Sequence, residues 1–160
     1  MKLKIGAWEK LAGYKTVDID PNTRPDIVAD ACNMKMIKTS SVDEIFCGHV
    51  LEHIPDQLKA MKEFHRVLKA NGRLNLIVPH ALNPNFHSAI DHHKGWTYGT
   101  PNMFWQETHV NYPKFRCIRR RLVLRNKGLQ WLADKFPIKV EYLYWLLQPD
   151  YIEAELEAIK

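Results

Sequence analysis

Three short apolar runs of the sequence end in residues that could contact a bound nucleoside. Asp18 ends the first run, Asp30 follows the second, and the pair Gly48-His49 follows the third. In dinucleotide sites, a carboxylate at such a position accepts hydrogen bonds from ribose hydroxyl groups. Because the strands of an open parallel sheet end at one edge, these residues would meet in a single crevice. The spacing therefore predicts a ligand site at one edge of a sheet.

Short segments rich in β-branched and aromatic residues are the strands that would position these side chains. The link between the first two strands, residues 7–13, is too short for a crossover helix, because a parallel connection usually needs a dozen or more residues. We expect a loop or about one helical turn there. The expected strands are residues 2–6, 15–19, 26–29, 42–47 and 73–78.

The clearest helical pattern runs over residues 55–69. Pro55 suits the first turn of a helix, and Asn71-Gly72 supplies a left-handed stop. A strand, a helix and a strand in that order form one crossover unit, so the sequence predicts an α/β fold with a parallel sheet. The residues expected on the buried face of the helix are Leu58, Met61, His65 and Leu68.

The second half of the chain begins with residues 80–113, a segment of Asn, His, Pro, Gly and large aromatic residues. A segment this long without periodicity is often functional, and we interpret it as a lid or substrate loop. Its aromatic side chains could stack on a sugar or base, or form the core of a folded lid. They are Trp96, Tyr98, Phe104, Trp105 and Tyr112. Beyond this segment we expect a strand at 117–124, a helix at 128–136, a strand at 139–147 and a helix at 149–159.

Composition and charge indicate one domain over residues 1–160. The apolar content of 46% is enough for one core of ordinary size. No stretch approaches the roughly 20 apolar residues that cross a bilayer, so we expect a cytoplasmic protein with no membrane partner. The net charge is +5, and basic residues are densest between positions 114 and 121. Solvated arginines on a strand or a contact with phosphate or nucleic acid would both explain this cluster.

Six motifs follow one another along the chain: Gly6, KLAGYKTVDI (10–19), DIVAD (26–30), SVDEI (41–45), HVLEHI (49–54) and RVLKANG (66–72). Their order and spacing resemble the class I S-adenosylmethionine-dependent methyltransferases. The likeness is greatest to a compact subgroup of phages and bacteria in which the link after the first strand is short. The resemblance implies a Rossmann-like, mostly parallel sheet flanked by helices in a single compact domain.

The same resemblance implies that the chain binds S-adenosylmethionine and releases S-adenosylhomocysteine. Gly6 would let the backbone approach the methionine part of the cofactor. Asp18 would bind both ribose hydroxyls, and Asp30 with Ala31 would meet the adenine edge. Asp18 as a turn residue and Asp30 as a cap are the alternative interpretations. The implied cofactor-binding residues are Gly6, Ala7, Trp8, Asp18, Ile19, Asp30, Ala31, Gly48 and His49.

Trp8 departs from the family pattern, which has a second glycine at this position. An indole there could block the methionine pocket. It could instead lie over the sulfonium and contribute a cation–π contact of roughly 0.5–2 kcal/mol. A surface or core aromatic beside a rearranged site is the third alternative.

Three histidines are candidates for the proton transfer that methylation of a weak nucleophile requires. His80 follows an expected strand, and His92 and His93 lie beside Asp91 in the expected lid. The adjacent pair could also be solvated loop residues, and His53 a packing residue. We expect no metal ion, because the histidine spacings of this segment match no zinc pattern.

Three functions from different classes are compatible with these observations. The first is a methyltransferase whose acceptor is an unidentified small molecule, glycan or macromolecule. The second is a non-catalytic module that keeps the fold but has lost productive cofactor geometry at Trp8. The third is a nucleic-acid-binding protein that uses the basic residues 119–121, with or without methylation.

Overall fold

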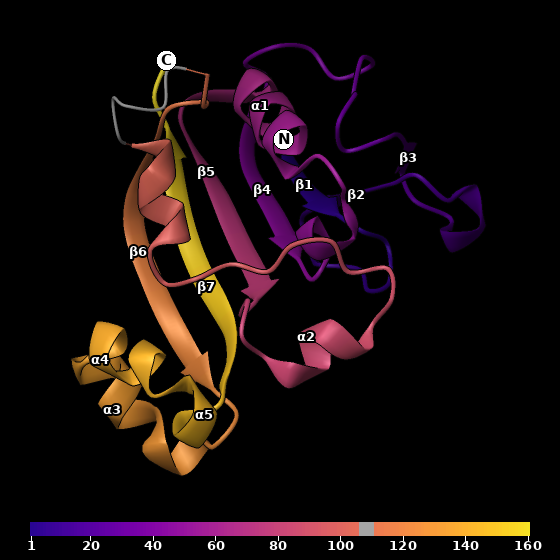
Figure 1. Cartoon of the computed structure of the whole chain (residues 1–160). Coiled ribbons are helices and arrows are strands. Elements are labelled where there is room, and N and C mark those ends of the chain that lie inside the picture. Colours follow the sequence, from indigo (N-terminus) through magenta and orange to yellow (C-terminus); the bar gives the residue numbers. More distant parts are fainter. Residues whose placement is uncertain (106–110) are drawn as a thin grey trace.

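The computed structural model describes residues 1–105 and 111–160, and it contains a seven-stranded sheet in the order β3-β2-β1-β4-β5-β7-β6 (Figure 1). Strands β3, β2, β1, β4 and β5 are parallel, whereas β7 is antiparallel to both β5 and β6. The predicted α/β, mostly parallel, Rossmann-like sheet flanked by helices is confirmed. The strands are β1 (Lys2–Ile5), β2 (Lys15–Asp18), β3 (Ile27–Val28), β4 (Val42–Gly48), β5 (Leu68–Pro79), β6 (Phe115–Leu124) and β7 (Pro149–Ala158).

Apolar side chains alternate along the strands, and those on one face are buried in the core. Along β5, Leu74, Leu76 and Val78 are buried on one face, while Ile77 on the other face is half-buried. Period-two burial is what a pleated strand produces, since successive side chains point to opposite faces. The predicted arrangement of this strand is therefore confirmed.

The link between β1 and β2 contains no helix, as the sequence predicts. Residues 6–14 return the chain to the start of β2, and the backbone N–H of Gly6 donates to the carbonyl of Val17 at 2.8 Å. Each of the two strands has only four residues, so a short loop spans the distance back. This loop leaves the end of β1 uncovered by any helix.

Helix α1 (Gln57–Val67) begins two residues later than predicted, because Asp56 caps it by accepting from the backbone N–H of Lys59 at 2.9 Å. The helix ends before Leu68, which is extended and starts β5. Asn71 is left-handed as expected, with φ of 61°, but it lies within β5. The buried residues of the helix are Gln57, Ala60, Met61, Phe64 and Val67, so of the expected face only Met61 is both helical and buried.

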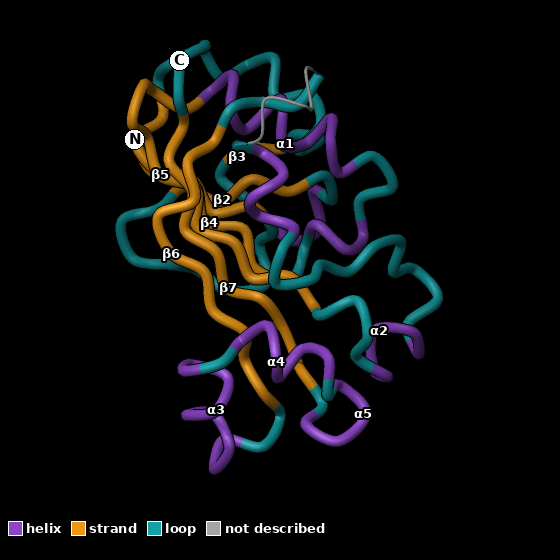
Figure 2. Tube along the Cα trace, turned by 60° about the vertical axis from the view of Figure 1, so that its left-hand side comes forward, coloured by secondary structure: helices purple, strands orange, loops and turns teal. Residues whose placement is uncertain are grey.

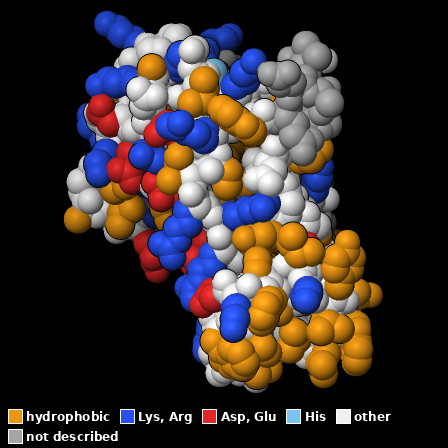
Figure 3. Space-filling model, turned by 90° about the vertical axis from the view of Figure 1, so that its left-hand side faces the viewer, with side chains coloured by type: hydrophobic (Ala, Val, Ile, Leu, Met, Phe, Trp, Pro, Cys, Tyr) orange, Lys and Arg blue, Asp and Glu red, His pale blue; other side chains and the backbone are white. Residues whose placement is uncertain are grey.

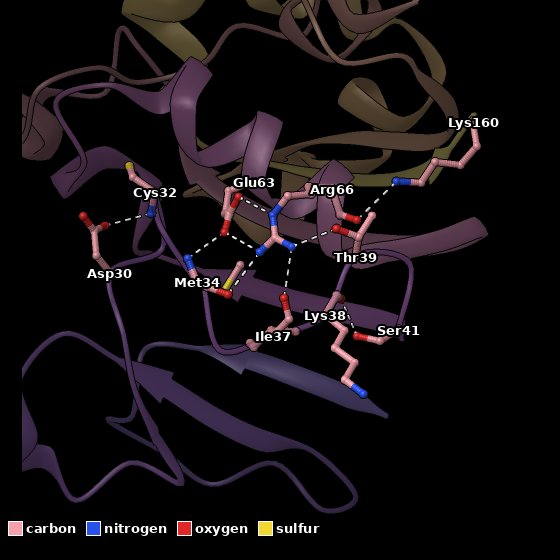
Figure 4. Close-up of polar contacts among 10 residues, drawn as sticks. All are labelled: Asp30, Cys32, Met34, Ile37, Lys38, Thr39, Ser41, Glu63, Arg66 and Lys160. Carbon is pink, nitrogen blue, oxygen red and sulfur yellow. Dashed lines mark hydrogen bonds and ion pairs between the residues drawn. The ribbon is translucent and has the colours of Figure 1, made fainter.

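Arg66 on α1 holds the irregular segment between β3 and β4 in place, as Figure 4 shows. Its guanidinium group binds both carboxylate oxygens of Glu63 at 2.7 and 2.8 Å. It also donates to the backbone carbonyls of Met34 and Ile37, each at 3.0 Å, and to Thr39 Oγ1 at 3.1 Å. One side chain thereby satisfies the backbone of a segment that has no regular structure of its own.

Two predictions for the C-terminal quarter are wrong. The predicted strand at 139–147 is helical, and the predicted helix at 149–159 is strand β7. A short apolar run cannot be assigned to helix or strand by periodicity alone. In β7 the buried residues Ile152, Ala154 and Leu156 alternate, and pairing with β5 and β6 decides the outcome. The helices of this half are α2 (Pro84–Ser88), α3 (Gln130–Lys135), α4 (Pro137–Tyr142) and α5 (Tyr144–Leu147).

Helices α3, α4 and α5 gather beyond one end of β6 and β7, whereas α2 lies apart from them, beyond the end of β5 (Figure 1 and Figure 2). Several apolar side chains of α3–α5 are exposed and form the large hydrophobic area of Figure 3. In the described residues, no helix is both long and apolar enough to cross a membrane. The exposed residues of this area are Trp131, Phe136, Ile138, Tyr142, Leu143, Tyr144, Trp145 and Leu146.

Part of the predicted lid, residues 80–113, packs onto the rest of the protein through its aromatic residues. Trp96 and Phe104 are buried, and Trp96 Nε1 donates to Gln57 Oε1 of α1 at 2.9 Å. The ring of Tyr112 lies 5.5 Å from that of Phe104. These contacts favour the interpretation of Trp96, Phe104 and Tyr112 as part of a folded core, whereas Trp105 is exposed. Residues 106–110 of this segment, which include His109, lie outside the described residues.

Candidate functional site

A cavity of about 630 Å³ opens at the ends of β1, β2 and β4. This is the edge at which parallel strands present their terminal residues to a ligand. Most of the residues predicted for the cofactor line this cavity together, although they come from distant parts of the sequence. Those in its wall are Gly6, Trp8, Asp18, Ile19, Asp30, Ala31 and His49.

Gly6 forms the floor of the cavity at the end of β1 and has a left-handed backbone, with φ of 83°. A Cβ atom at this position would lie 2.8 Å from Val50 Cγ2. Only glycine therefore fits here without strain. Its bare backbone leaves room for a ligand to approach the chain closely.

Asp18 lines the cavity and also organises the loop after β1. Its Oδ2 atom accepts from the backbone N–H of Ala7 at 2.8 Å, and Oδ1 accepts from the N–H of Asp20 at 3.0 Å. A carboxylate has about four lone-pair sites, so acceptor capacity remains for ligand hydroxyl groups. The bond with Asp20 gives Asp18 the turn role that was the alternative interpretation, in addition to its place in the wall.

Asp30 and Ala31 form the wall of the cavity beyond β3. Asp30 Oδ1 accepts from the backbone N–H of Cys32 at 2.8 Å, which is an Asx turn. Ala31 is buried. The turn fixes the direction of the backbone and leaves the second oxygen of Asp30 for a ligand.

The remaining predicted positions differ in how they meet the cavity. Ala7 and Gly48 are not part of its wall, although Ala7 contributes its N–H to Asp18. His49, at φ 53°, extends an exposed ring over the cavity, with Nδ1 3.4 Å from Glu52 Oε1. That carboxylate raises the pKa of His49, while burial of the ring opposes the shift.

Trp8 stands at the rim of the cavity with 87% of its surface exposed, so the indole does not fill the space. We expect Trp8→Ala to change the affinity for S-adenosylhomocysteine by less than about 0.5 kcal/mol, as for other exposed side chains. Calorimetric titration measures this difference. A loss of tenfold or more would mean that the indole closes over the ligand when it binds.

A second cavity, of about 250 Å³, shares His49 with the first. The ring of Tyr151 meets that of His49 edge-on at 5.7 Å between centroids. Sequence reasoning missed Tyr151 because residues 149–159 were predicted as a helix. The alternating burial of β7 was the signal that could have found it. This cavity is lined by His49, Pro79, Asn83, Asn85, Phe86, His92, Asp150 and Tyr151.

The structure does not bring all three predicted catalytic histidines to these cavities. His80 is fully buried, with Nε2 2.9 Å from Glu141 Oε1, while Nδ1 accepts from the N–H of Leu82. It lines neither of these cavities, and its contacts are those of a structural residue, so a catalytic role for His80 stays a prediction without support from its position. His92 lines the second cavity. His93 is exposed and contributes its backbone N–H to the carbonyl of Glu52 at 2.7 Å.

Glu141 joins α4 to the segment after β5 through His80 and the backbone N–H of Tyr98. Burial alone would raise the pKa of Glu141, but these hydrogen bonds lower it overall.

The lowered pKa of Glu141 stabilises the folded protein above about pH 4.5, the ordinary pKa of a glutamate. This stabilisation is lost as the pH falls through the pKa of Glu141 in the folded protein. We expect the difference in unfolding free energy between the wild type and Glu141→Gln to shrink below that pH. Denaturant titrations between pH 3 and pH 7 test this, and a difference independent of pH would contradict it.

The basic cluster between positions 114 and 121 is largely engaged within the chain. Arg121 pairs with Asp134 at 2.8 Å, and Arg120 donates to the carbonyl of Tyr98 at 2.8 Å. Arg116 pairs with Glu157 on β7. These contacts favour the interpretation of the cluster as arginines of a surface strand.

Comparison with known proteins agrees with this geometry. Residues 7–76 match the family model described as a methyltransferase domain, and this range includes the cavity residues from Trp8 to Lys59 but not Gly6. Comparison with curated protein sequences gave no significant match. The resemblance to S-adenosylmethionine-dependent methyltransferases is confirmed by this family match over residues 7–76. The compact subgroup of phages and bacteria stays a prediction.

The solved structures that resemble the chain share its fold at low sequence identity. A SAM-dependent methyltransferase from Archaeoglobus fulgidus is 14% identical, with a TM-score of 0.69, over 98% of this chain and 85% of that one. The N-methyltransferase NodS from Bradyrhizobium japonicum, solved with S-adenosylhomocysteine, is 14% identical, with a TM-score of 0.63, over 99% and 78%. The [4+2]-cyclase SpnF is 12% identical, with a TM-score of 0.60, over 99% and 74%. A cyclase among these structures illustrates that the fold by itself does not define the reaction.

Proposed function

We propose that the chain binds S-adenosylmethionine in the larger cavity and transfers its methyl group to an acceptor held in the smaller one. The observation that carries this proposal is the position of His49, which forms part of the wall of both cavities. A donor and an acceptor on the two sides of one side chain can approach each other there. The acceptor is a small molecule, a glycan or a group on a macromolecule.

The larger cavity offers each part of the cofactor a suitable contact. Gly6 accommodates the methionine part, because its backbone carries no Cβ atom. Asp18 accepts hydrogen bonds from the ribose, and Asp30 with the backbone of Ala31 meets the adenine edge. Ile19, 69% exposed at the mouth, packs on the face of the adenine. His49, and Gly48 behind it, lie beneath the sulfonium.

Methyl transfer requires little additional chemistry from the protein, because the bound cofactor supplies an already activated methyl group. The chain must hold the acceptor atom in line with the methyl group and keep water out. Tyr151, Asn83, Phe86 and His92 shape the acceptor side, and the ring of His92 contacts that of His53 in the wall of the larger cavity. These residues therefore determine which acceptor fits.

Calorimetric titration with S-adenosylhomocysteine, S-adenosylmethionine and NAD tests the cofactor. Both the methionine-derived cofactor and NAD bind at this edge of a parallel sheet in related folds. Because the residues of this cavity belong to the methyltransferase motifs, we expect the first two ligands to bind and NAD not to bind. Binding of none of the three would overturn the proposal and favour the non-catalytic alternative. Salt-dependent binding of a polynucleotide by the same protein would then support the nucleic-acid function.

A variant that fills only the smaller cavity separates cofactor binding from transfer. Asn85 lines that cavity; its backbone N–H donates to Asn83 Oδ1, and its side chain forms no hydrogen bond with the described residues. We expect Asn85→Trp to leave the affinity for S-adenosylhomocysteine unchanged and to reduce methyl transfer at least tenfold, to whichever acceptor is found. Transfer of a labelled methyl group measures this effect. Undiminished transfer would show that the acceptor enters elsewhere.

A further inference from the structure

Two histidines and a glutamate come together where the two cavities meet. Glu52 and His53 end the short turn Leu51–His53, and His92 comes from the segment after α2. One carboxylate oxygen of Glu52 and one ring nitrogen of each histidine lie within 4.8 Å of one another. The rings of His53 and His92 meet edge-on, with centroids 4.7 Å apart. Three potential metal ligands therefore converge on one point.

Glu52 is the buried member of this cluster, with only 1% of its surface exposed. Its Oε2 atom has no hydrogen-bond partner among the described residues. Oε1 lies 3.4 Å from His49 Nδ1. A buried carboxylate oxygen without a partner is costly, and a bound cation would remove that cost. The unpaired oxygen is the observation that distinguishes this cluster from an ordinary group of polar side chains.

The Nδ1 atom of His53 and the Nδ1 atom of His92 each lie within hydrogen-bond distance of an acceptor. His92 Nδ1 is 3.0 Å from the carbonyl of Phe86, and His53 Nδ1 is 2.8 Å from Asp91 Oδ2. Both partners only accept, so in the neutral imidazole each Nδ1 carries the proton and each Nε2 offers its lone pair to an ion. Histidines that bind metals have this arrangement, with the far N–H donated to a carboxylate or a carbonyl.

We propose that Glu52, His53 and His92 bind a divalent transition-metal ion, for which Zn²⁺ is the probe. Imidazole nitrogens favour such ions over Mg²⁺ or Ca²⁺, and two histidines with one glutamate are a known zinc ligand set. Three protein ligands leave a fourth position for water or a ligand oxygen. The sequence-based expectation of no metal considered the histidines of residues 80–109 and overlooked Glu52 and His53.

The ligands need only a modest movement to close on an ion. At zinc–ligand distances near 2.1 Å, tetrahedral ligands are roughly 3.4 Å apart, compared with the separations of up to 4.8 Å in this cluster. The side chain of His53 is 43% exposed, and His92 is half-buried, so both rings have room to turn. Glu52 stays fixed in the core and sets the position of the ion. This inference stands whether or not the larger cavity binds a cofactor.

Titration of the chelator-treated protein with Zn²⁺, and with Co²⁺ as a spectroscopic probe, tests the site. We expect one equivalent of Zn²⁺ to bind and to raise the melting temperature. His53→Gln and His92→Gln should each weaken binding at least about tenfold, whereas His87→Gln, an exposed histidine nearby, should not. Equal affinity in wild type and both ligand variants, or equal loss in the His87 control, would overturn the proposal.

Glu52→Gln adds a test of the buried oxygen. The amide removes the charge and should weaken Zn²⁺ binding, while the apo protein should be as stable as the wild type or more stable. If this variant does not fold, the two histidine variants still decide the question, because their side chains lie nearer the surface. The affinity for S-adenosylhomocysteine, measured in parallel without metal, keeps a failure of the metal site distinct from a failure of the cofactor site.

Discussion

Asp18→Ala should weaken the binding of S-adenosylhomocysteine by about 1–3 kcal/mol, a factor of roughly 5 to 150. Two losses combine in this variant. The ribose loses a charged acceptor for its hydroxyl groups. The backbone N–H of Ala7 loses its partner at 2.8 Å, so the loop beside Gly6 is less well held. Isothermal titration calorimetry measures the change, and unaltered affinity would show that the ribose binds elsewhere.

Two further variants separate these contributions. Asp18→Asn keeps an oxygen that can accept from Ala7 but removes the charge, so we expect it to lose less affinity than the alanine variant. Asp20→Ala removes the neighbouring carboxylate, which caps the turn Pro21–Thr23 and is not part of the cavity wall. Its affinity should equal that of the wild type. If Asp20→Ala lost as much as Asp18→Ala, disturbance of the loop would account for both effects.

Arg66→Ala should lower the free energy of unfolding by about 2–3 kcal/mol, less than the roughly 3–5 kcal/mol that breaking a fully buried ion pair costs. The side chain of Arg66 is 33% exposed, so water replaces part of what is lost. The variant leaves Glu63 without its bidentate partner and removes one donor from each of the carbonyls of Met34 and Ile37, although the Met34 carbonyl still accepts from the N–H of Ile37. Urea denaturation measures the loss from the midpoint and slope.

The geometry of the guanidinium group, and not its charge alone, should account for much of this stability. We expect Arg66→Lys to recover only part of the loss, because an ammonium group cannot reproduce the planar fork. Lys62→Ala, an exposed change on the same helix, should shift the unfolding free energy by less than about 0.5 kcal/mol. Full recovery by lysine would mean that simple charge pairing holds the segment.

Because the segment that Arg66 holds leads from Asp30 to β4, the same variant has a second consequence. Loss of its anchor should loosen the wall of the larger cavity beyond β3. We therefore expect Arg66→Ala to reduce the affinity for S-adenosylhomocysteine as well, although no atom of Arg66 lines the cavity. Asp18→Ala differs from this variant: we expect a large loss of affinity for S-adenosylhomocysteine and little loss of unfolding free energy.

The first half of the fold could be predicted from the sequence because its signals are local. Strands β1, β2, β4 and the regular part of β5 were expected within one or two residues, and the short link after β1 was expected as a loop. The start of α1 was displaced by two residues because Asp56 caps the helix, which then begins at Gln57. A capping hydrogen bond between neighbouring residues decides such boundaries, and a periodic pattern does not resolve them.

The expected strand at 117–124 and helix at 128–136 are confirmed as β6 and α3, but the last quarter of the chain could not be predicted because its signals are ambiguous. Ile152 and Leu156 fit the buried face of a helix as well as that of a strand. The choice of strand depends on hydrogen bonds to β5 and β6, which lie far away in the sequence. The error at β7 also hid Tyr151 and with it the second cavity.

The sequence alone determined which polar residues end the strands of a parallel sheet, and hence that Asp18, Asp30 and His49 share one edge. That follows from the periodicity of strands and from their common direction. Only the tertiary structure decided that His80 is buried against Glu141, and that Glu52 and His53 meet His92. Such meetings depend on how loops cross the end of the sheet. Their positions result from packing among residues distant in sequence, which no local pattern records.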